Sequence, residues 1–208
     1  MDERTPRRWG KQLRERVAAL VLLALTSPLF VACALAIKLE GLFSRRARGP
    51  VLFAEDRMSG GRVIKLLKFR TLTAEALAGL PPGPTHIKHL ENGGALTRTG
   101  HVLKQWYLDE LPQFINIVRG DMALIGTRPW PLDIYEAELA RGITRKRDMP
   151  AGLIGPVQAE KGIGQRTDLD IDTEYWKALR TYSGWRLLKL DLAIVARSIK
   201  VFLEHKGL

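Results

Sequence analysis

Two adjacent carboxylates, Asp109 and Glu110, are the residues of this sequence best suited to chemistry. Pro112 follows them, and proline is favoured in the first turn of a helix. The pair is therefore expected just before a helix N-terminus, where unpaired N–H groups and the helix dipole favour anions. A lone Asp-Glu pair in such a place is usually a capping cluster.

Basic residues accompany the two carboxylates along the chain and favour a second interpretation. They are Lys68, Arg70, Arg98, Lys104 and Arg128. Phosphoryl transfer needs this combination, because a carboxylate can attack phosphorus or hold Mg²⁺ while cations offset the charge on the phosphate oxygens. The sequence therefore predicts either a helix cap or a phosphoryl-transfer site.

Short elements of a mixed α/β (α+β) fold are expected to position these residues. Residues 49–54 and 62–72 are predicted strands joined by a turn at 59–61, which makes a hairpin. On the second strand, Lys68 and Arg70 would project to one face, roughly 6 to 7 Å apart. Helices are expected over 101–107 and from 112 to 120.

A long amphipathic helix is expected at the C-terminus, over residues 185–204. Its apolar positions are spaced by four, three, four and three residues, at Leu188, Leu192, Val195, Ile199 and Phe202. Such a helix either packs on the domain core or lies in the interface of a membrane.

Residues 17–37 form a run of 21 residues without a charge, long enough as a helix to cross the hydrocarbon core of a bilayer. Each flank carries a net charge of +3, so the positive-inside tendency draws both ends to the cytoplasmic side. Pro28 breaks the hydrogen-bond pattern near the midpoint, and Ser27 can satisfy a freed carbonyl. Two arrangements follow: a re-entrant helix broken at Ser27-Pro28, or a kinked single-pass anchor.

Composition and charge limit the remaining choices. The 208 residues suit an anchor of residues 1–40 followed by one domain of residues 41–208, and the single cysteine excludes an internal disulfide. With 33 Lys and Arg against 22 Asp and Glu, the net charge of +11 predicts an anionic partner. No motif of a groove-reading protein is present, so we expect no nucleic-acid partner.

Several motifs occur in the order seen in the bacterial sugar transferases, the small monotopic phosphoglycosyl transferases, and the resemblance covers nearly the whole chain. They lie at residues 49–53, 68–71, 108–113, 120–122 and 128–129. Ser27-Pro28 resembles the break in that family's re-entrant membrane helix. Residues 152–155, together with Gln158, resemble its later glycine motif.

The resemblance implies a bacterial enzyme at the cytoplasmic face of the inner membrane, with amphipathic helices at the interface. It would transfer a phosphosugar from a UDP-sugar to polyprenyl (undecaprenyl) phosphate, releasing UMP, in exopolysaccharide or glycoconjugate assembly. Asp109 would be the nucleophile of a ping-pong reaction, and Glu110, the second catalytic residue, would bind Mg²⁺ or assist proton transfer. The metal site implied consists of Asp109 and Glu110. The substrate-binding residues implied are Lys68, Arg70, Arg98, Lys104, Arg128 and Gln158. A homodimer is left open.

This sequence departs from the family's pattern at several positions. Lys104 replaces an arginine, which removes the bidentate fork, and Thr127 replaces a proline. Further departures are residues 105–107, Ala151 and Glu160 with its two successors. The basic residues Arg145, Lys146 and Arg147 are expected on a solvated or headgroup-facing surface. The alternative to an enzyme is a non-catalytic, membrane-anchored scaffold of a glycan pathway.

Overall fold

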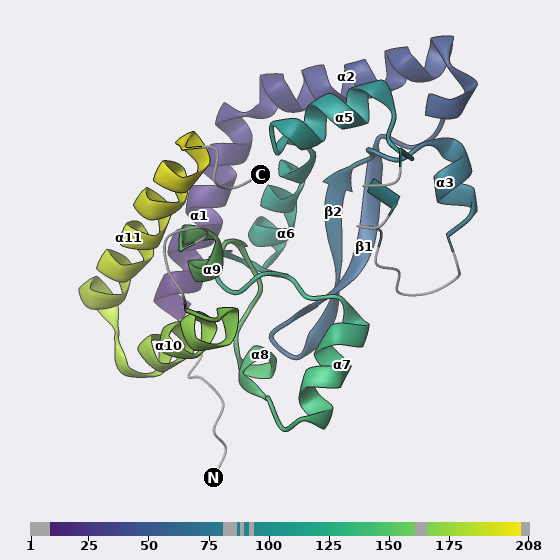
Figure 1. Ribbon diagram of the computed structural model, residues 1–208. Helices are drawn as coiled ribbons and strands as arrows, with labels where there is room; N and C mark the ends of the chain where they lie inside the picture. Colours follow the sequence, from purple (N-terminus) through teal and green to yellow (C-terminus); the bar gives the residue numbers. More distant parts are fainter. Residues whose placement is uncertain (1–8, 81–86, 88–89, 92–93, 161–165, 205–208) are drawn as a thin grey trace.

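Helices surround two small sheets in the computed structural model, which describes residues 9–80, 87, 90–91, 94–160 and 166–204 (Figure 1). The first part contains α1 (Trp9–Leu25), α2 (Ser27–Phe43), η1 (Arg45–Ala47), β1 (Leu52–Ser59), β2 (Arg62–Phe69) and α3 (Ala74–Ala78). The middle contains α5 (Arg98–Gln105), η2 (Leu108–Glu110), α6 (Gln113–Arg119), β3 (Ala123–Ile125) and α7 (Leu132–Ala140). The last part contains α8 (Arg145–Asp148), β4 (Gly152–Ile154), α9 (Pro156–Ala159), α10 (Asp168–Thr181) and α11 (Gly184–Leu203). This mixture confirms the predicted α/β class.

The apolar N-terminal segment is two helices that meet at an angle of 60°, with the break at the predicted place. Thr26 separates α1 from α2, and Pro28 lies in the first turn of α2. The Ser27 hydroxyl donates at 2.7 Å to the carbonyl of Ala24, which has no amide donor because residue 28 is proline. The Thr26 hydroxyl donates at 2.7 Å to the carbonyl of Leu22, which also accepts from the Thr26 amide. Within the described residues, neither helix alone is long and apolar enough to cross a membrane, whereas the bent pair together meets that length and composition. The predicted division at residue 40 falls inside α2.

The predicted hairpin is present, with strands that differ from the expected ones. β1 extends to Ser59 because its alternating residues keep pairing with β2, from Leu52 opposite Phe69 to Ser59 opposite Arg62. The two-residue turn consists of Gly60 and Gly61, both at positive φ, as this tight connection requires. β2 ends at Phe69, so Lys68 lies on the strand and Arg70 lies beyond it.

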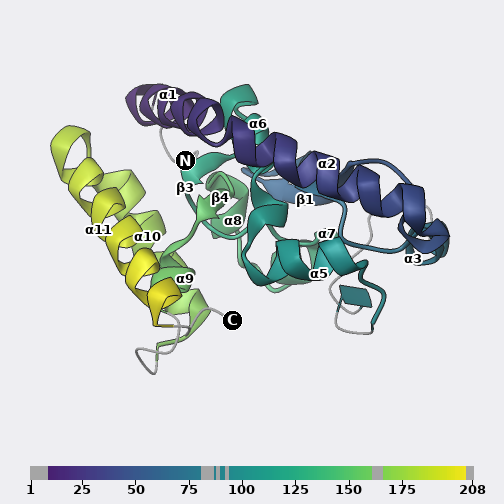
Figure 2. The ribbon, with the colours of Figure 1, turned by 90° about the horizontal axis from the view of Figure 1, so that it is seen from above.

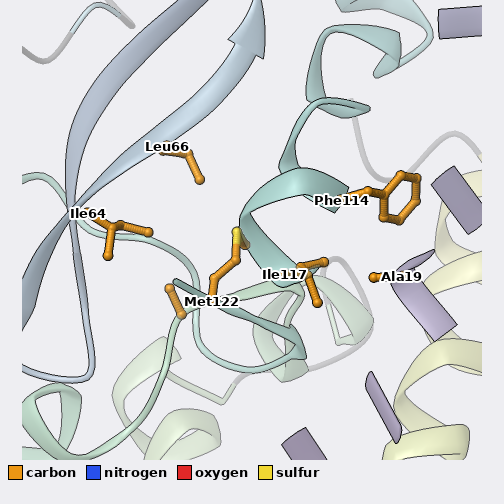
Figure 3. Packing of buried hydrophobic residues seen from close by; sticks show 7 residues of the cluster. Ala19, Ile64, Leu66, Phe114, Ile117 and Met122 are labelled. Atoms are coloured by element: carbon orange, nitrogen blue, oxygen red, sulfur yellow. The ribbon is translucent and has the colours of Figure 1, made fainter. Parts of the chain in front are cut away.

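Helix α6 lies between the hairpin and α1, and this packing forms the central apolar core (Figure 3). Ile117 of α6 is fully buried among Ile64 and Leu66 of β2 and Ala19 of α1. Gly120 ends α6 in the left-handed conformation, at φ 81°. The position of α6 fixes the residues immediately before it, which include Asp109 and Glu110.

A second cluster joins the remaining part of the chain to this core. The parallel pair β3–β4 carries it, and α10 and α11 cover it. The face of α11 that packs inward consists of Leu187, Asp191, Ile194 and Val201. The predicted apolar stripe of α11 is divided: Val195 packs against this cluster, whereas Leu192, Ile199 and Phe202 are exposed.

Helix α1 is tied to α11 by a buried polar network. Lys11 Nζ lies 2.7 Å from a carboxylate oxygen of Glu15 and 2.7 Å from one of Asp191. Tyr175 of α10 donates to the other oxygen of Asp191 at 2.9 Å, and Glu15 accepts from the amide of Ile125 at 3.1 Å. Figure 2 shows α11 beside the α1 end of the bent pair and α5 below α2. The network holds together elements that are far apart in sequence.

Candidate functional site

Asp109 and Glu110 lie in the turn η2, between α5 and α6, as their spacing from Pro112 predicts. Tyr107 enters this turn with φ 55°, and among the described residues it is the sole non-glycine residue with positive φ. Such a backbone costs of order 1–3 kcal/mol and is typical of functional sites. No side chain caps the N-terminus of α6, so the capping-cluster interpretation has no hydrogen bond to support it.

The Asp109 carboxyl is buried, with 4% of the residue exposed. Burial and the neighbouring charge of Glu110 raise the pKa of Asp109 to about 6, while Lys68 and Lys104 oppose the shift. At neutral pH the group is therefore mostly the carboxylate form, which is the form a nucleophile needs.

Lys68, at the end of β2, faces the two carboxylates of the turn. Burial lowers the pKa of Lys68, but the attraction of Glu110, Glu55 and Asp109 outweighs burial and raises the pKa above its ordinary value. Lys68 therefore remains charged next to Asp109. This places a cation where phosphate oxygens would need one.

Two other predicted cations belong to the same electrostatic cluster. Lys104, in the last turn of α5, forms an ion pair with Glu91, and its positive charge lowers the pKa of Asp109. Arg128 is exposed. Burial and the negative charge of Glu110 raise the pKa of Tyr107, and the positive charge of Arg128 opposes this shift. The Tyr107 ring also contacts Phe202 of α11 edge-on, with the ring centroids 5.9 Å apart.

The position of Arg70 does not support the substrate contact predicted for it. Its side chain is buried, and its guanidinium donates to the carbonyls of Pro50, Leu72 and Ala47 at 2.9, 2.8 and 2.5 Å. These hydrogen bonds tie three backbone carbonyls together, two of them through buried hydrogen bonds, so we assign Arg70 a structural role. The expected alternation of Lys68 and Arg70 along one strand fails because β2 ends between them.

Arg98 and Gln158 lie on elements outside the turn. Arg98 is exposed at the start of α5, where its backbone N–H and that of Thr99 donate to the carboxylate of Glu40 at 2.9 and 2.8 Å. Gln158 lies on α9, and its buried Oε1 has no hydrogen-bond partner among the described residues. In the described part of the chain, no hydrogen bond or ion pair connects either side chain to Asp109.

The basic run on α8 is not the uniformly solvated surface that was expected. Arg145 is buried, with its guanidinium 3.6 Å from a carboxylate oxygen of Glu138. Arg147 is exposed, and its Nε lies 3.5 Å from Oδ1 of Asp148. The side chain of Lys146 lies outside the described part of the structure. Of the departures, Thr127 is buried beside Ala151, and Glu160 forms ion pairs with Arg166 and Arg197.

Sequence reasoning missed Glu55, Arg57 and Glu91, which all carry charge at this site. Glu55 and Arg57 are buried on β1, and the hairpin register places them on the same face as Lys68, which is opposite Phe53. Two-residue alternation along β1 could have revealed this face if the strand had been predicted through Ser59. Glu91 could not be found in this way, because it follows a loop.

Comparisons with known proteins identify the family of the chain. The bacterial sugar transferase family matches residues 6–205, and the chain belongs to that family. A UDP-glucose:undecaprenyl-phosphate glucose-1-phosphate transferase of Caulobacter vibrioides is 34% identical over 201 residues, which are 91% of this chain and 68% of that protein. The exopolysaccharide production protein ExoY of Rhizobium meliloti is 30% identical, over 95% of this chain and 87% of its own length.

A third relative is a UDP-N-acetylgalactosamine-undecaprenyl-phosphate N-acetylgalactosaminephosphotransferase of Aeromonas hydrophila. It is 31% identical over 92% of this chain, and the matching part is 43% of that protein. The shared segment therefore includes the hairpin, the Asp109 turn and the helices around them.

Proposed function

We propose that this protein transfers a sugar phosphate from a UDP-sugar to undecaprenyl phosphate, releasing UMP and starting the assembly of a polysaccharide or another glycoconjugate. The observation that supports this proposal most directly is the environment of Asp109. Its carboxyl is buried but mostly ionised at neutral pH, and it lies with Glu110 near the cations Lys68 and Lys104. The relatives' names support the donor class and the lipid acceptor.

The proposed reaction has two steps, with Asp109 as the nucleophile. A carboxylate oxygen of Asp109 attacks the β-phosphorus of the UDP-sugar, the bond to the bridging oxygen breaks, and UMP leaves with that oxygen. The product is a phosphosugar ester of Asp109. The phosphate of undecaprenyl phosphate then attacks the same phosphorus, which frees Asp109 and forms the lipid diphosphate sugar. Lys68, Lys104 and Arg128 offset charge on the oxygens.

Mg²⁺ is the proposed cofactor, held by Asp109 and Glu110. These residues fit the ion, because Mg²⁺ is usually bound by one or two carboxylates together with substrate phosphates. Burial is the main cause of the raised pKa of Asp109, and the neighbouring charge of Glu110 adds to it; a divalent cation bound between the two carboxylates would offset this second contribution. When bound, the ion would supply charge neutralisation at the phosphates.

The bent pair α1–α2 is the proposed membrane element, re-entering the cytoplasmic leaflet of the bacterial inner membrane. Large apolar side chains on both helices are exposed, including Val17, Leu20, Val21, Leu25, Leu29, Val31 and Leu35. α2 also packs against Leu108 and Leu111, which flank Asp109 and Glu110. This arrangement would hold the catalytic turn near the headgroup level, where the phosphate of the lipid acceptor lies.

The decisive experiment measures UMP release from a panel of UDP-sugars with Mg²⁺ and undecaprenyl phosphate. We expect release with at least one donor and a loss of at least about 10³-fold in Asp109→Asn, because the amide is not a nucleophile. Mass spectrometry of the wild-type protein with donor alone should find the phosphosugar on Asp109. The exposed Glu136→Gln is the matched control.

Full turnover by Asp109→Asn would contradict the covalent route. Absence of UMP with every donor would favour the scaffold interpretation instead.

A further inference from the structure

The hairpin supplies a third carboxylate to the Asp109 site. The Glu55 side chain is fully buried, and its Oε2 accepts hydrogen bonds from Nε and Nη2 of Arg57 at 3.3 and 2.9 Å. Its Oε1 is also buried and has no hydrogen-bond partner among the described residues. A buried carboxylate with an unsatisfied oxygen is costly, so its retention needs an explanation.

Lys68 lies between this carboxylate and the catalytic turn. Its Nζ is 3.6 Å from Oε2 of Glu55, within ion-pair distance but too long for a hydrogen bond. Of the carboxylates that attract Lys68, Glu110 acts most strongly, and Glu55 precedes Asp109. One ammonium group is therefore shared between the hairpin and the turn.

We propose that Glu55 limits the affinity of the site for its anionic donor by holding part of the charge of Lys68. This inference rests on the proposed transferase function. The Glu55 carboxylate adds negative charge beside the place where the donor phosphates would bind, and it draws Lys68 towards β1. Neutralising Glu55 leaves Lys68 wholly available to the turn and to the phosphates, while a glutamine oxygen can still accept from Arg57.

The neighbouring residue offers a matched control. Asp56 follows Glu55 on β1, so its side chain lies on the opposite face of the hairpin. It forms its own ion pair with Lys65, at 2.7 Å. Glu55→Gln and Asp56→Asn therefore each remove one negative charge from β1. The first removes the ion-pair partner of Lys68 on β1, and the second removes that of Lys65.

The first measurement compares donor kinetics and UDP affinity in the two variants. In Glu55→Gln we expect the KM for the UDP-sugar and the Kd for UDP to fall by about three- to tenfold, with kcat changed less than about twofold. Asp56→Asn should leave both constants at the wild-type values. A KM and Kd that are unchanged or higher in Glu55→Gln would overturn the proposal.

The second measurement follows the lysines directly, by reductive methylation of the full chain with mass spectrometry. Lys68 should react several-fold faster in Glu55→Gln, and Lys65 faster in Asp56→Asn, each without effect on the other. An unchanged Lys68 rate would show that Glu55 does not hold this lysine and would overturn the proposal. If the wild-type protein released no UMP, the proposed transferase function would be wrong. The role of Glu55 would then still be decided by the Kd for UDP and by the methylation rate of Lys68.

Discussion

At the scale of single residues, the molecule places the proposed nucleophile in an environment that opposes its ionisation. Asp109 is buried next to Glu110, and the cations Lys68 and Lys104 compensate for this environment only in part. Arg70 shows the opposite case, a charged residue of a recognisable motif whose hydrogen bonds to carbonyls are structural. Residue type alone does not distinguish a reacting group from a supporting one.

The ionisation of Asp109 gives a pH dependence with a definite sign. As the proposed nucleophile, Asp109 must be deprotonated, and burial with the charge of Glu110 raises its pKa to about 6. We expect kcat/KM for UMP release to fall about tenfold per pH unit below pH 6. A profile measured from pH 4.5 to 8 checks this, and a kcat/KM that stays level from pH 7 down to pH 4.5 would contradict the raised pKa.

The same shift affects stability. The folded-state pKa lies above the ordinary value of 3.8, so between 3.8 and about 6 the folded protein binds more protons than the unfolded chain. The free energy of unfolding therefore decreases as the pH rises through this window. Asp109→Asn should raise this free energy at pH 7 by up to about 3 kcal/mol, measured by denaturant unfolding, while the exposed Glu136→Gln should change it little.

At the scale of elements, the bend between α1 and α2 and the hairpin β1–β2 support the catalytic turn from two sides. α2 contributes Cys33 and Ile37 to a cluster with Phe69 and Leu103, the last of which belongs to α5. Glu40, near the end of α2, accepts from the first amides of α5. The position of α2 is therefore connected to the helix that leads into Asp109.

A re-entrant α1–α2 pair predicts that both of its ends are on the cytoplasmic side. In a Cys33→Ser background, Trp9→Cys and Ser44→Cys should each resist a membrane-impermeant maleimide in intact cells and react after the cells are permeabilised. The proposed reason is that the basic residues at both flanks keep both ends on one side, and the 60° bend between the helices lets the pair enter the leaflet without crossing it. Labelling of either end in intact cells would indicate a single-pass anchor.

At the scale of the whole molecule, α1 and α11 are joined through charges rather than apolar contacts alone. Lys11 lies between Glu15 and Asp191, and Asp191 also binds Tyr175, so residues from three helices share one buried network. The network specifies one arrangement of the N-terminal and C-terminal helices.

Removing Lys11 should therefore be strongly destabilising. Lys11→Met leaves Glu15 and Asp191 buried without their cation, and we expect a loss of about 3–5 kcal/mol in the free energy of unfolding. Adding Asp191→Leu should recover part of this loss, because one unpaired charge is removed. Denaturant unfolding measures both, with the exposed Lys177→Met as control. Additive losses in the double variant would exclude coupling of the pair.

Local signals in the sequence determined much of the fold and of the candidate site. Pro28 removes a backbone donor wherever it stands, Gly60-Gly61 permits a tight turn, and Pro112 with Gly120 marks a helix beginning and end. These effects act within a few residues, so the break, the hairpin and the position of the Asp109 turn were predictable. The order of the short motifs along the chain also indicated the bacterial sugar transferase family.

The tertiary structure decided which of the charged and apolar residues meet. The burial of Arg70 and Arg145, the inward face of α11 and the sharing of Lys68 with Glu55 all depend on partners from distant elements. Whether a charge is paired, buried or solvated is set by everything packed around it, and sequence spacing within one element does not contain that information.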